Sequence, residues 1–251
     1  MSGPSPSRSR LPDTIRQNPL LRRTVRGPYR AARRVLRTAR RQSTTWVKAL
    51  RRGYHRLGGP VRDRADLRRW ARAGRPAPPP PIVKQRLVRE YGRRHGIRLL
   101  VETGTYRGDM VAAQRRNFDR IWSMELQPSL AAKARARFAG AGNVTILEGD
   151  SAVLLPQILE LVDQPCLFWL DAHYSAGVTA RGDVDTPIAA ELDAVLRHPV
   201  VGHVVLVDDM RDFTGENDYP TAAALIAAIT ERRPDWAVEV VDDVLRASAR
   251  R

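Results

Sequence analysis

The chain has 251 residues, enough for one α/β domain of about 150 residues plus an extension, and 43% of them are apolar, which suffices for a core. The net charge of +16 comes from the N-terminal part, because residues 1–97 hold 27 basic and 4 acidic residues whereas residues 98–251 hold 16 and 23. A disulfide framework is excluded by the single cysteine, and no apolar run approaches the roughly 18 residues of a membrane span.

Two features of the composition indicate a cytoplasmic protein. Residues 1–46 lack the apolar core of a secretory signal; their acid-poor, Arg- and Ser-bearing composition superficially resembles a transit peptide but equally suits a disordered basic arm. Cys166 begins the apolar run 166–170, so we expect a small buried side chain rather than a nucleophile.

Forty of the 43 basic residues are Arg, a bias that a GC-rich genome also produces, so the Arg count is weak evidence for a phosphate partner.

The N-terminal third is predicted to consist of three parts. Residues 1–28 are rich in Pro, Ser and Arg, which favours disorder. Residues 29–75 are predicted to form a basic, amphipathic helical extension, because over residues 29–57 apolar residues recur at alternating steps of three and four on an otherwise basic surface. This helix could dock on the domain or on another copy of the chain, or lie on an anionic membrane; nucleic acid is the least favoured partner, because no recognition motif accompanies the charge. A short helix at 66–73 precedes a proline-rich linker at 76–81.

Residues 82–251 form the second predicted domain, in which strand-like and helix-like segments alternate after a first helix at 82–95. We predict strands at 98–102, 120–125, 143–147, 166–171 and 203–207, and helices at 107–117, 128–138, 151–161, 184–197 and 221–232. Runs at 236–241 and 244–249, joined by two aspartates, predict a terminal antiparallel hairpin. The pattern is typical of an α/β, Rossmann-like doubly wound, mostly parallel seven-stranded sheet.

The first strand of this domain ends in a glycine-bearing turn. Glu102 closes the apolar run, and Gly104 and Gly108 open the next helix, an arrangement by which a parallel strand presents a nucleotide-like ligand to a helix N-terminus. Glu125 ends the second strand, 21 residues beyond Gly104, where a carboxylate suits the two hydroxyls of a ribose. After the third strand, Asp150 or Ser151 either caps the following helix or contacts a ligand.

Acids also follow the fourth and fifth strands. Asp171 and His173 follow the fourth strand, and Asp208 and Asp209 follow the fifth. Neighbouring strand ends would bring three carboxylates and an imidazole together, and crowded like charges are costly unless a proton or a cation offsets them. A divalent cation with oxygen ligands, Mg²⁺ above all, provides that offset.

Five alternating units followed by a hairpin resemble the class I S-adenosylmethionine (SAM)-dependent methyltransferases over residues 82–251. Residues 102–108 look like the first motif of that family. The resemblance implies that Gly104, Thr105, Tyr106 and Gly108 approach the methionine part of SAM, with Glu102 near its ammonium. It further implies that Glu125 binds the ribose and that Asp150 or Ser151 contacts the adenine.

Within that family the acids look like those of the metal-dependent sugar O-methyltransferases that act on macrolide and aminocoumarin glycosides. The resemblance implies that Asp171, Asp208 and Asp209 hold the cation and that the base lies two residues past the first aspartate. This chain departs from the family there, since the position is His173. An imidazole can take a proton from a cation-bound hydroxyl, so we expect His173 to be the base, with a fourth ligand or a structural residue as alternatives.

The predicted function is therefore O-methylation of a hydroxyl on a sugar, glycolipid or secondary metabolite. Two alternatives stay open: an NAD-type oxidoreductase, although Tyr106 stands where its glycine motif would need a second glycine, and a non-catalytic membrane or nucleic-acid binding protein acting through its basic arm. Residues 174–187 and 211–220 are predicted lids over the acceptor.

Overall fold

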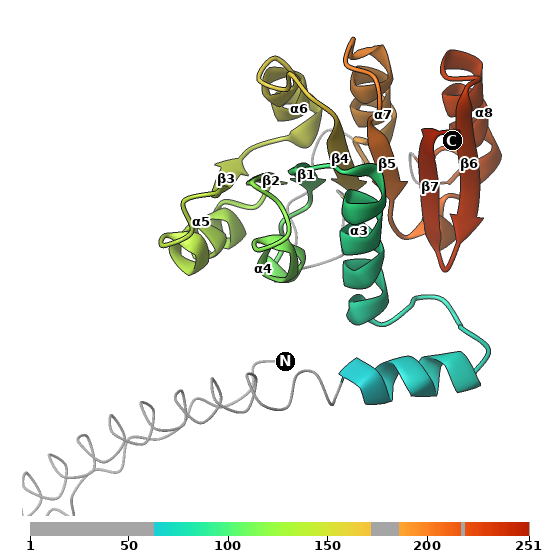
Figure 1. The fold of residues 1–251 in the computed structure, drawn as a ribbon, viewed down its shortest axis with the longest axis horizontal. Coiled ribbons are helices and arrows are strands. Elements are labelled where there is room, and N and C mark those ends of the chain that lie inside the picture. The colour runs from blue at the N-terminus through green and yellow to red at the C-terminus, as the bar shows by residue number, and fades with distance from the viewer. Residues whose placement is uncertain (1–62, 172–185, 217–218, 251) are drawn as a thin grey trace, which may run out of the picture. The chain divides into compact units, whose positions relative to one another are not determined.

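The computed structural model describes residues 63–171, 186–216 and 219–250 (Figure 1). The chain divides into two compact units, Met1–Arg64 and Ala65–Arg251, and the second contains the sheet and the helices described below. The predicted arm at 1–28 and helix at 29–57 lie outside the described residues, so the division of the N-terminal part stays a prediction. Among the described helices, none combines the length and the apolar composition that a membrane crossing needs.

Strands and helices alternate along the second unit, as predicted. The helices, after a helical stretch at 63–72, are α3 (Pro81–His95), α4 (Asp109–Gln114), α5 (Pro128–Phe138), α6 (Ser151–Leu159), α7 (Ile188–Arg197), a 3-10 turn η1 (Met210–Asp212) and α8 (Ala222–Arg232). The strands are β1 (Leu99–Thr103), β2 (Arg120–Glu125), β3 (Val144–Glu148), β4 (Cys166–Leu170), β5 (Val204–Val207), β6 (Trp236–Val241) and β7 (Val244–Ala249).

The seven strands form one sheet in the order β3-β2-β1-β4-β5-β7-β6. Strands β1 to β5 are parallel, and β7 pairs antiparallel with both β5 and β6, so the predicted fold class and terminal hairpin are confirmed. The strand order reverses direction between β1 and β4, where ligands bind in open α/β sheets.

Helices cover both faces of the sheet (Figure 1), which explains why its central strands are continuously apolar. Along β1, Leu99 and Val101 join one buried cluster and Leu100 joins the other, because successive side chains point to opposite faces. The first cluster contains Leu155 of α6, Leu192 of α7 and Ile229 of α8; the second contains Val88 of α3, Val111 of α4 and Phe138 of α5. Cys166 is fully buried, as expected, and burial raises the pKa of its thiol.

Helix starts differ from the predictions by a few residues, for local reasons. Helix α4 begins at Asp109 rather than at 107, because Gly108 adopts a left-handed conformation with φ of 72°. The last proline of the predicted linker, Pro81, is already the first residue of α3, a position where its missing N–H costs no hydrogen bond.

The β6–β7 hairpin turns at two aspartates that both have positive φ, 54° for Asp242 and 66° for Asp243. Two-residue hairpin turns of type I′ need positive φ at both central residues, and Asp tolerates it better than most residues. Each aspartate is also held by arginine: Asp242 pairs with Arg75 and Asp243 pairs with Arg211. The turn is thereby connected to the segment before α3 and to the segment after β5.

Two histidines, the buried His203 and the partly buried His198, join the amino end of β4 to α6. The Cys166 N–H donates to Nδ1 of His203 (3.0 Å), His203 and His198 share a 2.9 Å hydrogen bond, and His198 contacts the Leu159 carbonyl (3.0 Å). These hydrogen bonds can all form only if both rings are neutral, since Nδ1 of His203 is an acceptor. Burial lowers the pKa of His203 to about 4, and repulsion from Arg233 and from His198 when that ring is protonated adds to the effect.

This lowered pKa predicts acid destabilisation. As pH falls from about 6.5 towards 4, the unfolded chain takes up a proton at His203 that the folded chain refuses, so the free energy of unfolding should drop by at most roughly 3 kcal/mol. Below about pH 4 this residue adds no further loss. Urea unfolding at pH 7 and 4.5 should show a smaller loss in His203→Gln than in wild type; equal losses would refute the prediction.

Candidate active site at the carboxyl edge of the sheet

The turn from β1 to α4 is tight. Positive φ angles occur at Gly104 (80°), Tyr106 (49°) and Gly108 (72°), and the N–H groups of Gly104 and Thr105 both donate to the Met124 carbonyl of β2, at 3.0 and 2.9 Å. The glycine motif thus forms the strand-to-helix turn that the sequence indicates, held against the end of the neighbouring strand.

Gly108 has a second reason to be glycine. A Cβ atom there would lie 2.6 Å from Cε2 of Phe138, in addition to the strain of its left-handed backbone. We expect Gly108→Ala to lower the free energy of unfolding by about 2–4 kcal/mol, measured by urea denaturation. Gly140→Ala is the matched control, since nothing lies within 4 Å of its Cβ position, and should change stability by less than about 0.5 kcal/mol. Equal effects of the two changes would contradict this account.

Glu102 is buried at the end of β1 and faces β2. The Ser123 hydroxyl donates to the Glu102 carboxyl group and also lies 2.5 Å from the Thr105 hydroxyl. Glu102 is thereby connected through Ser123 to the β1–α4 turn. Burial raises the pKa of Glu102 to about 8, with the charges of Asp171 and Glu125 adding to the effect. Its carboxyl group is therefore largely neutral at pH 7, and its contact with a cofactor ammonium stays a prediction.

Glu125 ends β2 beside the same turn and is 4% exposed. Both carboxylate oxygens accept a backbone hydrogen bond: Oε2 from the Tyr106 N–H at 2.6 Å and Oε1 from the Gln127 N–H at 2.9 Å. Each oxygen keeps a further lone pair for a donor from a ligand. The carboxylate thus fixes the turn and is oriented by it.

Asp150 and Ser151 begin α6, and the structure shows which of the two caps the helix. Asp150 is the helix N-cap, with its side chain accepting from the Ala152 N–H at 2.8 Å. Ser151 is buried and lies near Glu191, an acid in the first turn of α7. Capping does not exclude a ligand contact by Asp150, which stays a prediction.

Glu191 is a buried acid that our sequence interpretation missed. It is 1% exposed and accepts from the Thr103 hydroxyl at 3.3 Å, and burial raises its pKa to about 8. A usable signal was present, because Glu191 is three residues after Ile188 and four before Val195, on the apolar stripe of its helix.

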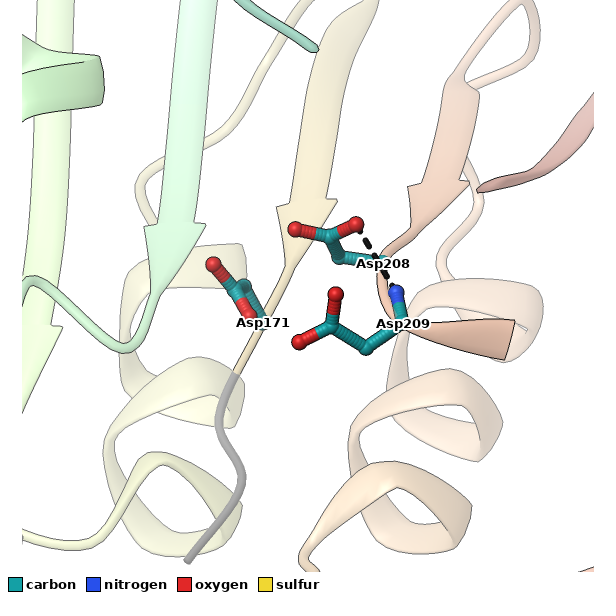
Figure 2. A group of neighbouring side chains, drawn as sticks. All are labelled: Asp171, Asp208 and Asp209. Carbon is teal, nitrogen blue, oxygen red and sulfur yellow. Dashed lines mark hydrogen bonds between the residues drawn. The ribbon is translucent and has the colours of Figure 1, made fainter. Parts of the chain in front are cut away.

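The ends of β4 and β5 bring three aspartates together (Figure 2). Asp171 follows β4, and Asp208 and Asp209 follow β5, with one carboxylate oxygen of each within 4.8 Å of the others. Asp208 also accepts the Asp209 N–H at 2.8 Å, drawn as the dashed line in Figure 2. Burial raises the pKa of Asp208, and the charges of Asp171 and Asp209 raise it further. The cluster needs positive charge to remain ionised.

Lys84, in the first turn of α3, provides such a charge and was also missed. Its Nζ lies 2.6 Å from Oδ2 of Asp208 and 2.7 Å from Oδ1 of Asp209, and its side chain is 15% exposed. Burial works against the ammonium, but the two aspartates outweigh it and raise the pKa of Lys84. The sequence offered one signal for a special role of Lys84, because it is one of only three lysines in an Arg-rich chain.

Arg211 is a second cation at the cluster. It lies 2.8 Å from Oδ1 of Asp209 and also pairs with Asp243 in the hairpin turn. These two aspartates raise the pKa of Arg211 despite its partial burial, so the group is always charged. The segment 211–220, predicted as a lid, is therefore attached at Arg211 to both the cluster and the hairpin.

A recess adjoins the three aspartates. Its wall consists of Leu170, Asp171, Thr186, Ile188, Val207, Asp208, Asp209, Phe213 and Tyr219. The rings of Phe213 and Tyr219 meet edge to face, with centroids 5.4 Å apart, and form an aromatic side of the recess. The recess therefore combines acids with apolar and aromatic surface.

His173, the predicted base, and most of the predicted lid 174–187 lie outside the described residues, which resume at Thr186. The Thr186 hydroxyl accepts from the Ile188 N–H at 3.4 Å, close to the start of α7. The role of His173 stays a prediction.

Solved methyltransferases share the topology of this chain. An O-methyltransferase from Bacillus cereus, in complex with SAH, superimposes with a TM-score of 0.52 and 17% sequence identity, over 75% of this chain and 90% of that one. The chain has the class I methyltransferase fold. TomG from Streptomyces achromogenes, an O-methyltransferase in complex with SAM, has a TM-score of 0.49 and 20% identity over 67% of this chain and 80% of its own.

At 17% identity the similarity to the Bacillus cereus enzyme establishes the fold alone, and function has to be argued from the site. Neither a scan against protein-family models nor a search of curated proteins found a match for the sequence.

Proposed function

We propose that the chain is a SAM-dependent methyltransferase that transfers a methyl group to a hydroxyl of its acceptor. The observation that carries the proposal is the arrangement at the carboxyl edge of a class I methyltransferase fold. There the β1–α4 turn and Glu125 adjoin the point where the strand order reverses, and the aspartate cluster lies at the ends of the next two strands.

The cofactor residues in this proposal surround the β1–α4 turn. Gly104, Thr105, Tyr106 and Gly108 present backbone to the methionine part of SAM, and Glu102 supports them through its hydrogen bond with Ser123. The preoriented carboxylate of Glu125 binds the ribose hydroxyls through its remaining lone pairs. Asp150 and Ser151, at the start of α6, are the proposed contacts of the adenine.

The proposed cation ligands are Asp171, Asp208 and Asp209. Three carboxylates with oxygens within 4.8 Å of one another fit Mg²⁺, which binds few carboxylates together with waters and substrate oxygens. When bound, Mg²⁺ supplies Lewis acidity that lowers the pKa of an acceptor hydroxyl. In this proposal the recess holds that hydroxyl beside the cofactor, and Phe213 and Tyr219 exclude water from it. His173 accepts the proton of the hydroxyl.

The acceptor class follows from the recess and from the resemblance together. The recess itself has room for little more than one reacting hydroxyl, and its aromatic and acidic walls suit the edge of a sugar ring that carries such a hydroxyl. A sugar, glycolipid or secondary metabolite is therefore the proposed substrate. We also propose that the protein is cytoplasmic and self-associates, and that residues 29–57 contact an anionic membrane. Co-sedimentation with anionic vesicles tests the membrane contact.

The topology distinguishes this function from an NAD-type oxidoreductase. Dinucleotide-binding folds have the strand order 3-2-1-4-5-6, whereas here β7 is inserted antiparallel between β5 and β6. Isothermal titration with SAH and with NAD tests the choice directly. We expect SAH to bind and NAD not to bind; the reverse result, or no binding of SAH, would refute the methyltransferase.

The acceptor can be searched for with a small panel. Purified protein with SAM and MgCl₂ is mixed with a catechol, a simple phenol or an alkyl glycoside, and SAH release is measured. We expect turnover with at least one hydroxyl compound and none with the corresponding O-methylated compound, in which the reacting oxygen is blocked.

A further inference from the structure

The ammonium group of Lys84 occupies oxygen atoms that a cation at the aspartate cluster would need. It contacts Oδ2 of Asp208 at 2.6 Å and Oδ1 of Asp209 at 2.7 Å, both within hydrogen-bonding distance. These two aspartates are two of the three members of the cluster. Their side chains are 2% and 10% exposed, so water competes little for the same oxygens.

Lys84 and a divalent cation would compete for the charge of the same two carboxylates. A metal ion bound to Asp208 and Asp209 would lie against the ammonium group in a buried place, where like charges repel strongly. The two carboxylates already offset the charge of Lys84, so a cation bound beside it would meet that repulsion. We propose that Lys84 is a built-in counter-ion that competes with the divalent cation for Asp208 and Asp209, so that the cation binds only when the Lys84 side chain leaves. This inference rests on the proposed cation-assisted methyl transfer.

The residue type and its position suit such an exchange. Lysine has a compact charge on a flexible four-carbon side chain, whereas the planar fork of arginine tends to remain bound to carboxylates through two hydrogen bonds. Leu87, Val88 and Tyr91 anchor α3 in the core, so only the Lys84 side chain has to move. When the Lys84 side chain leaves the cluster, Arg211 remains paired with Asp209 and still offsets part of the negative charge of the aspartates.

The test is direct measurement of Mn²⁺ affinity by electron paramagnetic resonance, with Mn²⁺ as the visible substitute for Mg²⁺. We expect Lys84→Met to bind Mn²⁺ at least about 10-fold more tightly than wild type, because the competing charge is gone. Lys84→Arg should bind it at least about threefold more weakly, because arginine releases carboxylates less readily. Lys133→Met, at an exposed lysine of α5, is the control and should match wild type.

Any other order of affinities overturns the proposal. If Lys84→Met binds Mn²⁺ no more tightly than wild type, Lys84 does not compete. If Lys84→Met unfolds because its aspartates lose their partner, Lys84→Arg still decides, since an affinity equal to or above that of wild type refutes the competition.

Titration of the same preparations with SAH separates this inference from the proposed function. If SAH binds but the Mn²⁺ affinities do not follow the expected order, the Lys84 proposal fails and the methyltransferase stands. If SAH does not bind to wild type, the methyltransferase fails whatever the Mn²⁺ result.

Discussion

Asp171→Asn is expected to abolish most methyl transfer while making the protein more stable. The carboxylate of Asp171 is one of three proposed cation ligands, and its replacement by an amide should lower the rate at least about 100-fold. The same charge helps to raise the pKa of Glu102, Glu191 and Asp208, so it opposes the ionisation of three buried acids. That repulsion acts when these acids ionise, near and above pH 8, so at pH 9 we expect its removal to raise the free energy of unfolding by about 1 kcal/mol.

Two measurements check this pair of effects. Release of SAH is followed with MgCl₂ and the acceptor that turns over in the panel, and stability is measured by urea unfolding at pH 9, where the buried acids are ionised. Asp163→Asn is the control, because Asp163 is exposed just before β4 and therefore near the opposite end of that strand; it should change neither quantity appreciably. A variant that is both less stable and fully active would show that Asp171 is an ordinary structural acid.

The sequence predicted the carboxyl edge well because that edge depends on local patterns. Short apolar runs indicate strands, and the alternation of strands with helices indicates a parallel sheet, so residues that follow successive strands must lie at one edge. Leu170 and Val207 are in register on neighbouring strands, and the aspartates that follow them therefore lie close together. The distance in sequence between Asp171 and Asp208 was no obstacle.

The partners of these acids could not be predicted in the same way. Lys84 lies 124 residues before Asp208, on a helix whose rotation about its axis decides which side chain reaches the cluster. With 43 basic residues in the chain, charge complementarity alone selects no particular one. Glu191 differs, since an acid on an apolar helical stripe by itself indicates either a buried hydrogen bond or a functional site.

Glu125→Gln is expected to weaken SAH binding about 100-fold. Both oxygens of Glu125 accept backbone hydrogen bonds, from Tyr106 at 2.6 Å and from Gln127 at 2.9 Å. In either orientation the amide of glutamine would turn its NH₂ group towards one of these N–H donors, so one hydrogen bond is lost and the turn at Tyr106 is displaced. A charge-assisted hydrogen bond to the ribose is lost as well, and each such bond contributes about 1.5–3 kcal/mol.

Glu148→Gln provides the matched control, because Glu148 is the register partner of Glu125 on the neighbouring strand β3. Its carboxylate is 37% exposed and pairs with Arg135 on the surface, so the change should alter SAH affinity by less than about threefold. Isothermal titration measures both affinities, and thermal unfolding shows whether each variant is folded. If folded Glu125→Gln binds SAH as tightly as Glu148→Gln does, the ribose does not bind at the end of β2 and the cofactor site must be sought elsewhere along the edge.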